Sequence, residues 1–206
     1  MSFEPKIVVS AAGLPPLEHA PVDADAIARA VREILVAIGE DPSRQGLRDT
    51  PRRVADSYTE LFSGYGVDPV SVLQPLQGER GKGLIMVRAI DVVSICEHHL
   101  LPFSGTAAVA YLPGEDGRIT GLSKLARVVD ALSRRLQVQE RLVREIADAL
   151  ERALEPRGIF VLVEAQHTCM SVRGARAPGS VTVTTDARGA FDDPATRTEL
   201  LALARG

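Results

Sequence analysis

The feature that most constrains the fold is the order of strand-like and helix-like hydrophobic patterns between residues 83 and 189. Two runs of strand-like composition, GLIMVRAIDVVSI and TAAVAYLP, are followed by two stretches with helical spacing, GLSKLARVVDALSRR and QVQERLVREIADALERALEP. Two further strand-like runs, GIFVLVEAQHTCM and SVTVTTDARG, complete the set. Because like elements come in pairs and do not alternate strictly, we predict an α+β fold with an antiparallel sheet and helices on one face.

A separate helical region precedes this unit. DADAIARAVREILVAIG carries apolar residues at helical spacing between Asp23 and Gly39. A second helix is predicted to start with Thr50 as its capping residue and Pro51 in its first turn. Its apolar face is expected to be buried and consists of Val54, Tyr58, Leu61 and Phe62.

The chain therefore divides into three parts. Residues 1–22 contain four prolines without periodicity and are expected to form a mobile tail. Residues 23–66 form an N-terminal helical region, and residues 67–206 form the main domain, which a short helix within PATRTELLALAR closes.

Charge and hydropathy exclude several classes of protein. A net charge of −3 over 206 residues argues against a general nucleic-acid or membrane-surface binder. No apolar run approaches the roughly 20 residues that cross a bilayer, and the N-terminus is a poor signal peptide. We expect a cytoplasmic protein with reduced thiols, without a nucleic-acid or membrane partner.

Residues that bind metals or move protons are concentrated in two short segments, SICEHHLLPF and EAQHTCM. The chain holds two cysteines and four histidines, and only His19 lies outside these segments. The five clustered residues are Cys96, His98, His99, His167 and Cys169. Such a distribution predicts a site where the two segments meet.

Thiolate and imidazole are the ligands that zinc favours. Cys96 and His99 stand three residues apart and can reach one ion if the chain turns, with Cys169 as the third ligand. Three protein ligands leave a fourth tetrahedral position for water, whose pKa zinc lowers to about 7. A structural zinc site would need a fourth protein ligand, and neither cysteine belongs to a Cys-x-x-Cys-like pair.

Two alternatives remain open at this point: the cysteines could form a disulfide, or they could be buried and inert beside a core histidine. If residues 167–169 continue a strand, His167 and Cys169 face the same side. That arrangement would place His167 beside the metal, free to move a proton. His98 and His99 would point to opposite sides of an extended backbone, so they need not share one role.

Four longer motifs, CEHHLLPFSG, GLSKLARVVD, RRLQVQERL and HTCMSVRG, resemble GTP cyclohydrolase I in order and separation. The upstream GEDPSRQGLRDTPRRVADSY is similar to the N-terminal helical region of that family, so the resemblance covers about residues 25–205. It implies a ββααββ tunnelling-type fold (T-fold) over residues 67–206. It also implies a homodecamer of two stacked pentamers, with active sites at subunit boundaries.

The implied reaction hydrolyses and rearranges GTP to 7,8-dihydroneopterin triphosphate and formate, the first step of a tetrahydrofolate or pterin synthesis. The resemblance assigns Zn²⁺ as the cofactor on Cys96, His99 and Cys169. It makes the residue matching His167 a general acid/base and the one matching His98 a helper at the same centre.

The remaining assignments concern the substrate. The resemblance implies that Glu140 accepts hydrogen bonds from the guanine edge, with Gln139 or nearby backbone groups supporting it. It implies that Ser123 bonds the ribose, and that cations bind the triphosphate: Lys124, Arg127, Arg173 and, more weakly, Arg53.

Each of these residues also has an ordinary structural interpretation. Glu140 could pair with Arg144 on a helix surface, Ser123 could cap the helix that starts beside it, and single cations are usually solvated. Asp56 stands where the family often has a basic residue, which puts a peripheral phosphate contact in doubt.

Two rival functions remain. One is another zinc-dependent purine hydrolase such as a nucleobase deaminase, which would carry His-x-Glu and Pro-Cys-x-x-Cys motifs that this chain lacks. The other is a non-catalytic ring-forming scaffold of the same fold, against which the five clustered residues argue.

Overall fold

The structure, a computed structural model, describes residues 21–206. Residues 1–20 of the predicted tail, with His19, lie outside the described residues. Within residues 21–206, no helix has both the length and the apolar character needed to cross a bilayer.

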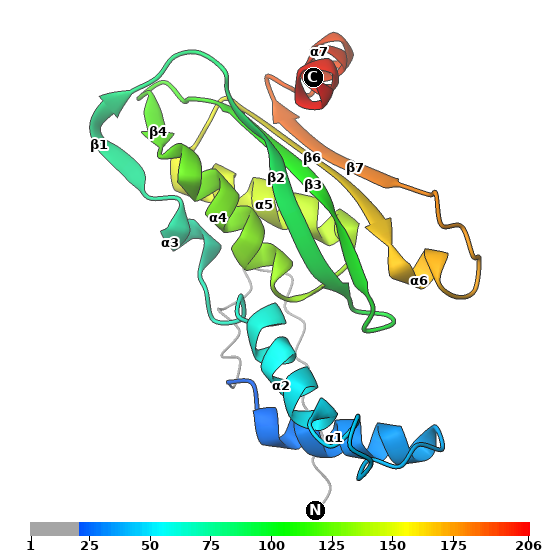
Figure 1. Ribbon diagram of the computed structural model, residues 1–206. Helices are drawn as coiled ribbons and strands as arrows, with labels where there is room; N and C mark the ends of the chain where they lie inside the picture. Colours follow the sequence, from blue (N-terminus) through cyan, green and yellow to red (C-terminus); the bar gives the residue numbers. More distant parts are fainter. Residues whose placement is uncertain (1–20) are drawn as a thin grey trace, which may run out of the picture.

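One five-stranded sheet organises the chain (Figure 1), in the order β5-β2-β3-β6-β7. Four long strands pair antiparallel with one another: β2 (Ile85–Cys96), β3 (Pro102–Leu112), β6 (Gly158–His167) and β7 (Thr182–Gly189). The short β5 (Leu136–Gln137) runs parallel to the end of β2.

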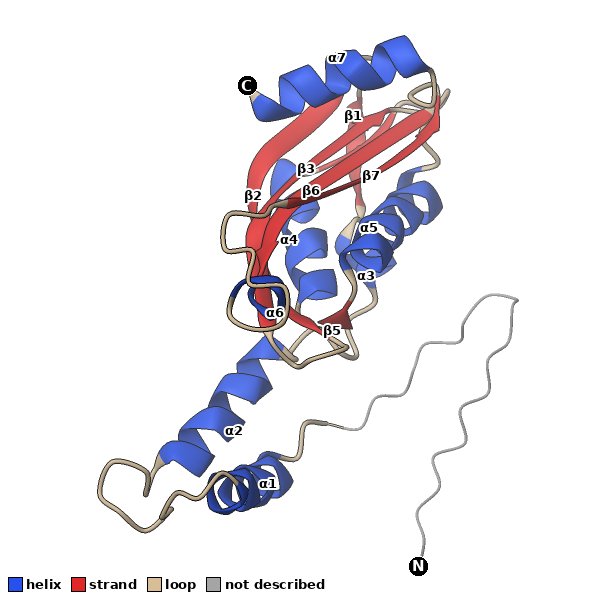
Figure 2. Cartoon of the chain, turned by 90° about the vertical axis from the view of Figure 1, so that its right-hand side faces the viewer, coloured by secondary structure: helices blue, strands red, loops and turns tan. Residues whose placement is uncertain are grey.

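Helices α4 (Leu122–Ser133) and α5 (Gln139–Leu154) cover one face of the sheet (Figure 2). Side chains alternate across a strand. In β6, Val161 and Val163 therefore pack under these helices. Phe160 and Leu162 pack on the opposite face, against α7 (Pro194–Arg205). Burial on both faces explains why the β6 sequence is almost continuously apolar.

The predicted α+β fold with a ββααββ core is confirmed, since β2, β3, α4, α5, β6 and β7 occur in that order. Smaller elements were not predicted. The strands β1 (Pro75–Arg80) and β4 (Arg118–Thr120) form a separate two-stranded sheet, and α3 (Pro69–Val72) precedes them.

The end of β6 differs from the prediction. The strand stops at His167, and Thr168–Ser171 forms the single-turn helix α6. Cys169 therefore lies on a helix, so the argument that two residues of one strand face the same side does not apply to it. The Thr168 hydroxyl donates to the carbonyl of Pro102 on β3, which ties the start of this turn to the sheet.

Helices α1 (Ala24–Ala37) and α2 (Thr50–Leu61) cross each other outside the sheet domain (Figure 1). Asp23 caps α1 as predicted, accepting from the backbone N–H of Ala26 at 2.8 Å. The capping position of α2 is Asp49, and Thr50 is already helical. The predicted apolar face of α2 is only half-buried, because α2 packs mainly against α1 and makes few contacts with the other described elements.

Candidate functional site

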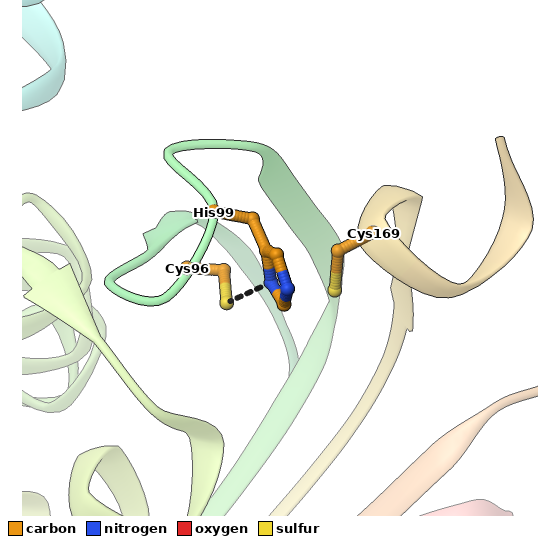
Figure 3. A group of neighbouring side chains, drawn as sticks. All are labelled: Cys96, His99 and Cys169. Carbon is orange, nitrogen blue, oxygen red and sulfur yellow. Dashed lines mark hydrogen bonds between the residues drawn. The ribbon is translucent and has the colours of Figure 1, made fainter. Parts of the chain in front are cut away.

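The two cysteine-containing segments meet at one end of the sheet. Cys96 is the last residue of β2, His99 lies in the turn between β2 and β3, and Cys169 lies on α6. Their ligand atoms all lie within 4.8 Å of one another. Figure 3 shows the three side chains pointing toward a common space, with Cys96 Sγ 3.7 Å from His99 Nδ1. Both cysteines are free thiols, which excludes the disulfide alternative.

A tight turn brings Cys96 and His99 to the same side. The carbonyl of Cys96 accepts from the backbone N–H of His99 at 3.4 Å and of Leu100 at 2.9 Å. Leu100 has a φ of 52°, a left-handed conformation that costs free energy for a residue with a branched side chain. The turn is therefore held against a local conformational preference.

An ion pair supports this turn from outside. Glu97, between Cys96 and His98, accepts from Arg141 on α5. The same guanidinium donates to the Leu136 carbonyl at 2.7 Å and to Gln137 Oε1 at 2.9 Å. Sequence reasoning did not identify Arg141 or Glu97, because a supporting ion pair between segments leaves no signal in residue spacing.

The donor set fits a metal ion. Two sulfurs and one imidazole nitrogen are the ligands expected for zinc or another borderline ion. Burial and the nearby Cys96 sulfur raise the pKa of the Cys169 thiol, while Arg173 acts in the opposite direction. Two neighbouring thiolates repel each other, so the doubly ionised pair is disfavoured unless a cation lies between the two sulfurs.

His167 lies at the end of β6, with its ring stacked on Phe103 (centroids 4.5 Å apart, planes 8° apart). The two residues are cross-strand partners in the β3–β6 ladder. Burial lowers the pKa of His167, and the Glu140 carboxylate opposes that shift. A ring with a lowered pKa is neutral at pH 7 and can accept a proton.

Gln139 and Glu140 occupy the first turn of α5 and face in different directions. Gln139 is 1% exposed, and its Oε1 lies 2.8 Å from His167 Nε2. Glu140 is exposed. The predicted alternative for Glu140, a pair with Arg144, is not formed, and no other ion pair involves Glu140 in the described part of the chain.

The predicted phosphate ligands come from separate elements. Lys124 and Arg127 lie on α4, and Arg173 follows α6. Among residues 21–206, the side chains of these three cations make no hydrogen bond and no ion pair. Arg53 on α2 differs, because its guanidinium lies 3.5 Å from Asp49.

The other predicted residues are exposed. Ser123 is the second residue of α4, whose capping position is Gly121, so the helix-capping alternative does not hold. The side chain of His98 is 63% exposed, and its Nε2 lies 3.9 Å from a Glu97 oxygen. It does not belong to the Cys–His–Cys group.

Comparison with known proteins gives consistent matches. The family model described as GTP cyclohydrolase I matches residues 27–205. A protein named GTP cyclohydrolase 1 from Mycolicibacterium vanbaalenii is 56% identical over 175 residues, covering 84% of this chain and 87% of the relative. Proteins of the same name from Streptomyces avermitilis and Mycobacteroides abscessus are 54% and 55% identical, covering 84% of this chain and 87% and 86% of the relatives.

Proposed function

We propose the chemistry of this chain from one premise: it belongs to the GTP cyclohydrolase I family. The chain is an enzyme that acts as a GTP cyclohydrolase. The reaction hydrolyses the imidazole ring of GTP, releases carbon 8 as formate and rearranges the ribose. The product is 7,8-dihydroneopterin triphosphate, which enters tetrahydrofolate or pterin synthesis. The Cys–His–Cys group, with the half-buried His167 two residues from Cys169, is the observation of this structure that carries the proposal.

Cys96, His99 and Cys169 would hold Zn²⁺. Their two sulfur donors and one nitrogen donor are ligand types that zinc favours, which supports this assignment. When bound, zinc supplies a Lewis acid that makes water nucleophilic at neutral pH. The part-exposed ligands keep the centre accessible from solvent.

Proton movement is the task of the histidines. Opening the guanine imidazole ring removes a proton from the attacking water and places protons on the departing nitrogens. His167, held at a fixed position and neutral at pH 7, accepts and returns such a proton. His98 assists from the exposed side of the same turn.

Glu140 recognises guanine. The guanine edge presents two donors, N1–H and the exocyclic amine, and one carboxylate can accept both. Its exposure and its lack of an ion pair among the described residues leave its oxygens available. Its effect on the pKa of His167 indicates that the two side chains share one neighbourhood.

The triphosphate binds to Lys124, Arg127 and Arg173, with Arg53 as a weaker ligand. Arginine can bind phosphate through two parallel hydrogen bonds. The first three carry no competing ion pair within residues 21–206, which supports this role. Ser123, one residue before Lys124, bonds the ribose.

The active enzyme is a cytoplasmic homodecamer of two stacked pentamers. Two features support an assembly in which a second copy covers the site. Exposed apolar side chains adjoin the metal ligands: Leu100 (51%), Met170 (37%) and Val172 (67%). In addition, β7 pairs only with β6 in the described chain, so its outer edge is free to join another sheet.

Incubating the zinc-loaded protein with GTP tests the proposal. We expect stoichiometric formate and a product that becomes a fluorescent pterin after oxidation. ATP is the matched control, and it should give neither, because adenine lacks the two donors that Glu140 accepts. A deaminated purine nucleotide would instead indicate the rival hydrolase, and binding without turnover would indicate a scaffold.

A further inference from the structure

The orientation of the Gln139 side chain is fixed by the groups around its amide. Its Nε2 lies 2.9 Å from the Val163 carbonyl oxygen, 3.0 Å from the Thr182 carbonyl oxygen and 3.0 Å from Thr184 Oγ1. Carbonyl oxygens can only accept hydrogen bonds. The amide nitrogen must therefore face β6 and β7, because a reversed amide would bring its oxygen against two carbonyl oxygens.

This orientation determines which nitrogen of His167 carries a proton. Gln139 Oε1 can only accept, and it lies 2.8 Å from His167 Nε2. The neutral ring must therefore donate from Nε2–H. The tautomer of a histidine is set by the hydrogen bond that one ring nitrogen makes, and the other nitrogen is left as the base. His167 Nδ1 has no hydrogen-bond partner in the described part of the chain.

The ring is also fixed in its plane. Phe103 is 1% exposed and stacks on His167 with an angle of 8° between the rings. A 180° rotation about the Cβ–Cγ bond would exchange Nε2 with Cε1 and place a carbon against Gln139 Oε1, which would break this hydrogen bond. The hydrogen bond and the stack together leave one orientation and one tautomer.

We propose that Gln139 is a positioning residue that holds His167 as its Nε2–H tautomer and leaves Nδ1 as the ring nitrogen without a partner in the described part of the chain. This inference rests on the proposed function for its catalytic meaning, in which Nδ1 is the atom of His167 that is available to the substrate.

A direct contact between the Gln139 side chain and guanine fits the structure less well. The side chain is 1% exposed, and both ends of its amide are already bonded within the protein. Glu140, the next residue, faces outward. The two neighbouring residues therefore have different proposed roles: Glu140 contacts the substrate, and Gln139 acts through His167.

Nitrogen NMR of the zinc-loaded full chain with ¹⁵N-labelled histidine tests the tautomer directly. Spectra are recorded well above the ordinary imidazole pKa of about 6.5, where the ring is neutral. The His167→Asn variant identifies the signals of this residue. We expect a protonated Nε2 and an unprotonated Nδ1 in the unmodified protein. A protonated Nδ1 would overturn the proposal.

Gln139→Met removes the Oε1 acceptor that faces His167 while keeping nearly the same side-chain length. We expect its His167 signals to move toward a mixture of tautomers, whereas Gln139→Glu, which retains an acceptor, keeps Nε2–H. Gln166→Met is the matched control. Gln166 precedes His167 on β6 and is exposed, so its replacement should leave the His167 tautomer unchanged.

Kinetics separate positioning from substrate binding. Losing a partner that orients a functional histidine costs about 10- to 100-fold, and we expect Gln139→Met to lower kcat by that factor with little change in KM for GTP. A rise in KM with unchanged kcat would assign Gln139 to the substrate and refute the proposal. If the unmodified protein released no formate, the proposed function would fail, yet the tautomer would still be measured.

Discussion

The two ends of the proposed site are built in different ways. At the metal and histidine end, side chains are oriented by contacts within the chain: Phe103 and Gln139 hold His167, and Arg141 holds the turn that carries two of the proposed metal ligands. At the proposed triphosphate end, the side chains of Lys124, Arg127 and Arg173 are exposed or half-exposed and make no hydrogen bond or ion pair among residues 21–206.

This difference matches the different demands of the proposed tasks. Proton transfer and metal binding need fixed geometry, which buried contacts within the sheet domain supply. Phosphate binding needs clustered charge, which tolerates mobile side chains and can be completed by the ligand or by another copy. The predictions below test this contrast, starting with the largest effect.

Cys169→Ala should abolish metal binding. Removing one of three protein ligands leaves two, so we expect the purified variant to contain no zinc and to form no product. Elemental analysis of the purified protein measures the metal content. Met170→Ala, on the same turn of α6, is the control and should retain zinc. Stoichiometric zinc in the cysteine variant would show that the ligands are other residues.

His167→Ala should separate metal binding from catalysis. A general acid/base contributes about 10²- to 10⁴-fold to a rate, and we expect kcat to fall within this range while zinc stays bound. His98→Ala should cause a smaller loss, because its ring is exposed and outside the ligand group. If zinc is lost from the His167 variant, that residue is a ligand and its assigned role is wrong.

Arg141→Lys tests the support of the ligand turn. Lysine offers a single ammonium and cannot bond Glu97, the Leu136 carbonyl and Gln137 at once. We expect the zinc affinity, measured by competition with a chelator, to fall by about 10- to 100-fold. Arg144→Lys, three residues along the same helix and exposed, should leave it unchanged. Equal affinities in both variants would contradict the supporting role.

Arg53→Ala should have the smallest effect. An exposed charge acting across about 4 Å of water is worth about 1 kcal/mol, or about fivefold in KM for GTP. Arg52→Ala on the same helix is the matched control, since Arg52 already pairs with Asp56 at 3.0 Å. A fall in kcat instead of a rise in KM would place Arg53 at the chemical step.

Much of the fold follows from hydrophobic periodicity. The six elements of the core have long patterns of period 2 or 3.6, and their order fixes the class. The shorter elements do not: β5 has two residues, and α6 has four. Elements this short depend on tertiary contacts, such as the bond from the Thr168 hydroxyl to β3, that no local pattern records.

The site was predictable where its chemistry depends on residue type. Cysteines and histidines are rare in this chain, so their clustering predicted the Cys–His–Cys group that the structure brings together; its role as a metal site stays a prediction. Phe103 and Arg141 were not predicted, because they are common residue types whose importance arises from register and burial. Gln139 was predicted only as a support for guanine binding, and its hydrogen bond to His167 appears only in the folded chain. Ser123 and His98 remain predictions, because their exposed side chains have no contact that assigns a role.

Zinc K-edge X-ray absorption of the loaded, full-length protein tests the central claim most directly. We expect two sulfur neighbours at about 2.3 Å and two nitrogen or oxygen neighbours at about 2.0 Å, one of which GTP analogues can perturb. A shell with one sulfur or none, or four protein ligands with no position open to solvent, would contradict a catalytic centre formed by Cys96, His99 and Cys169.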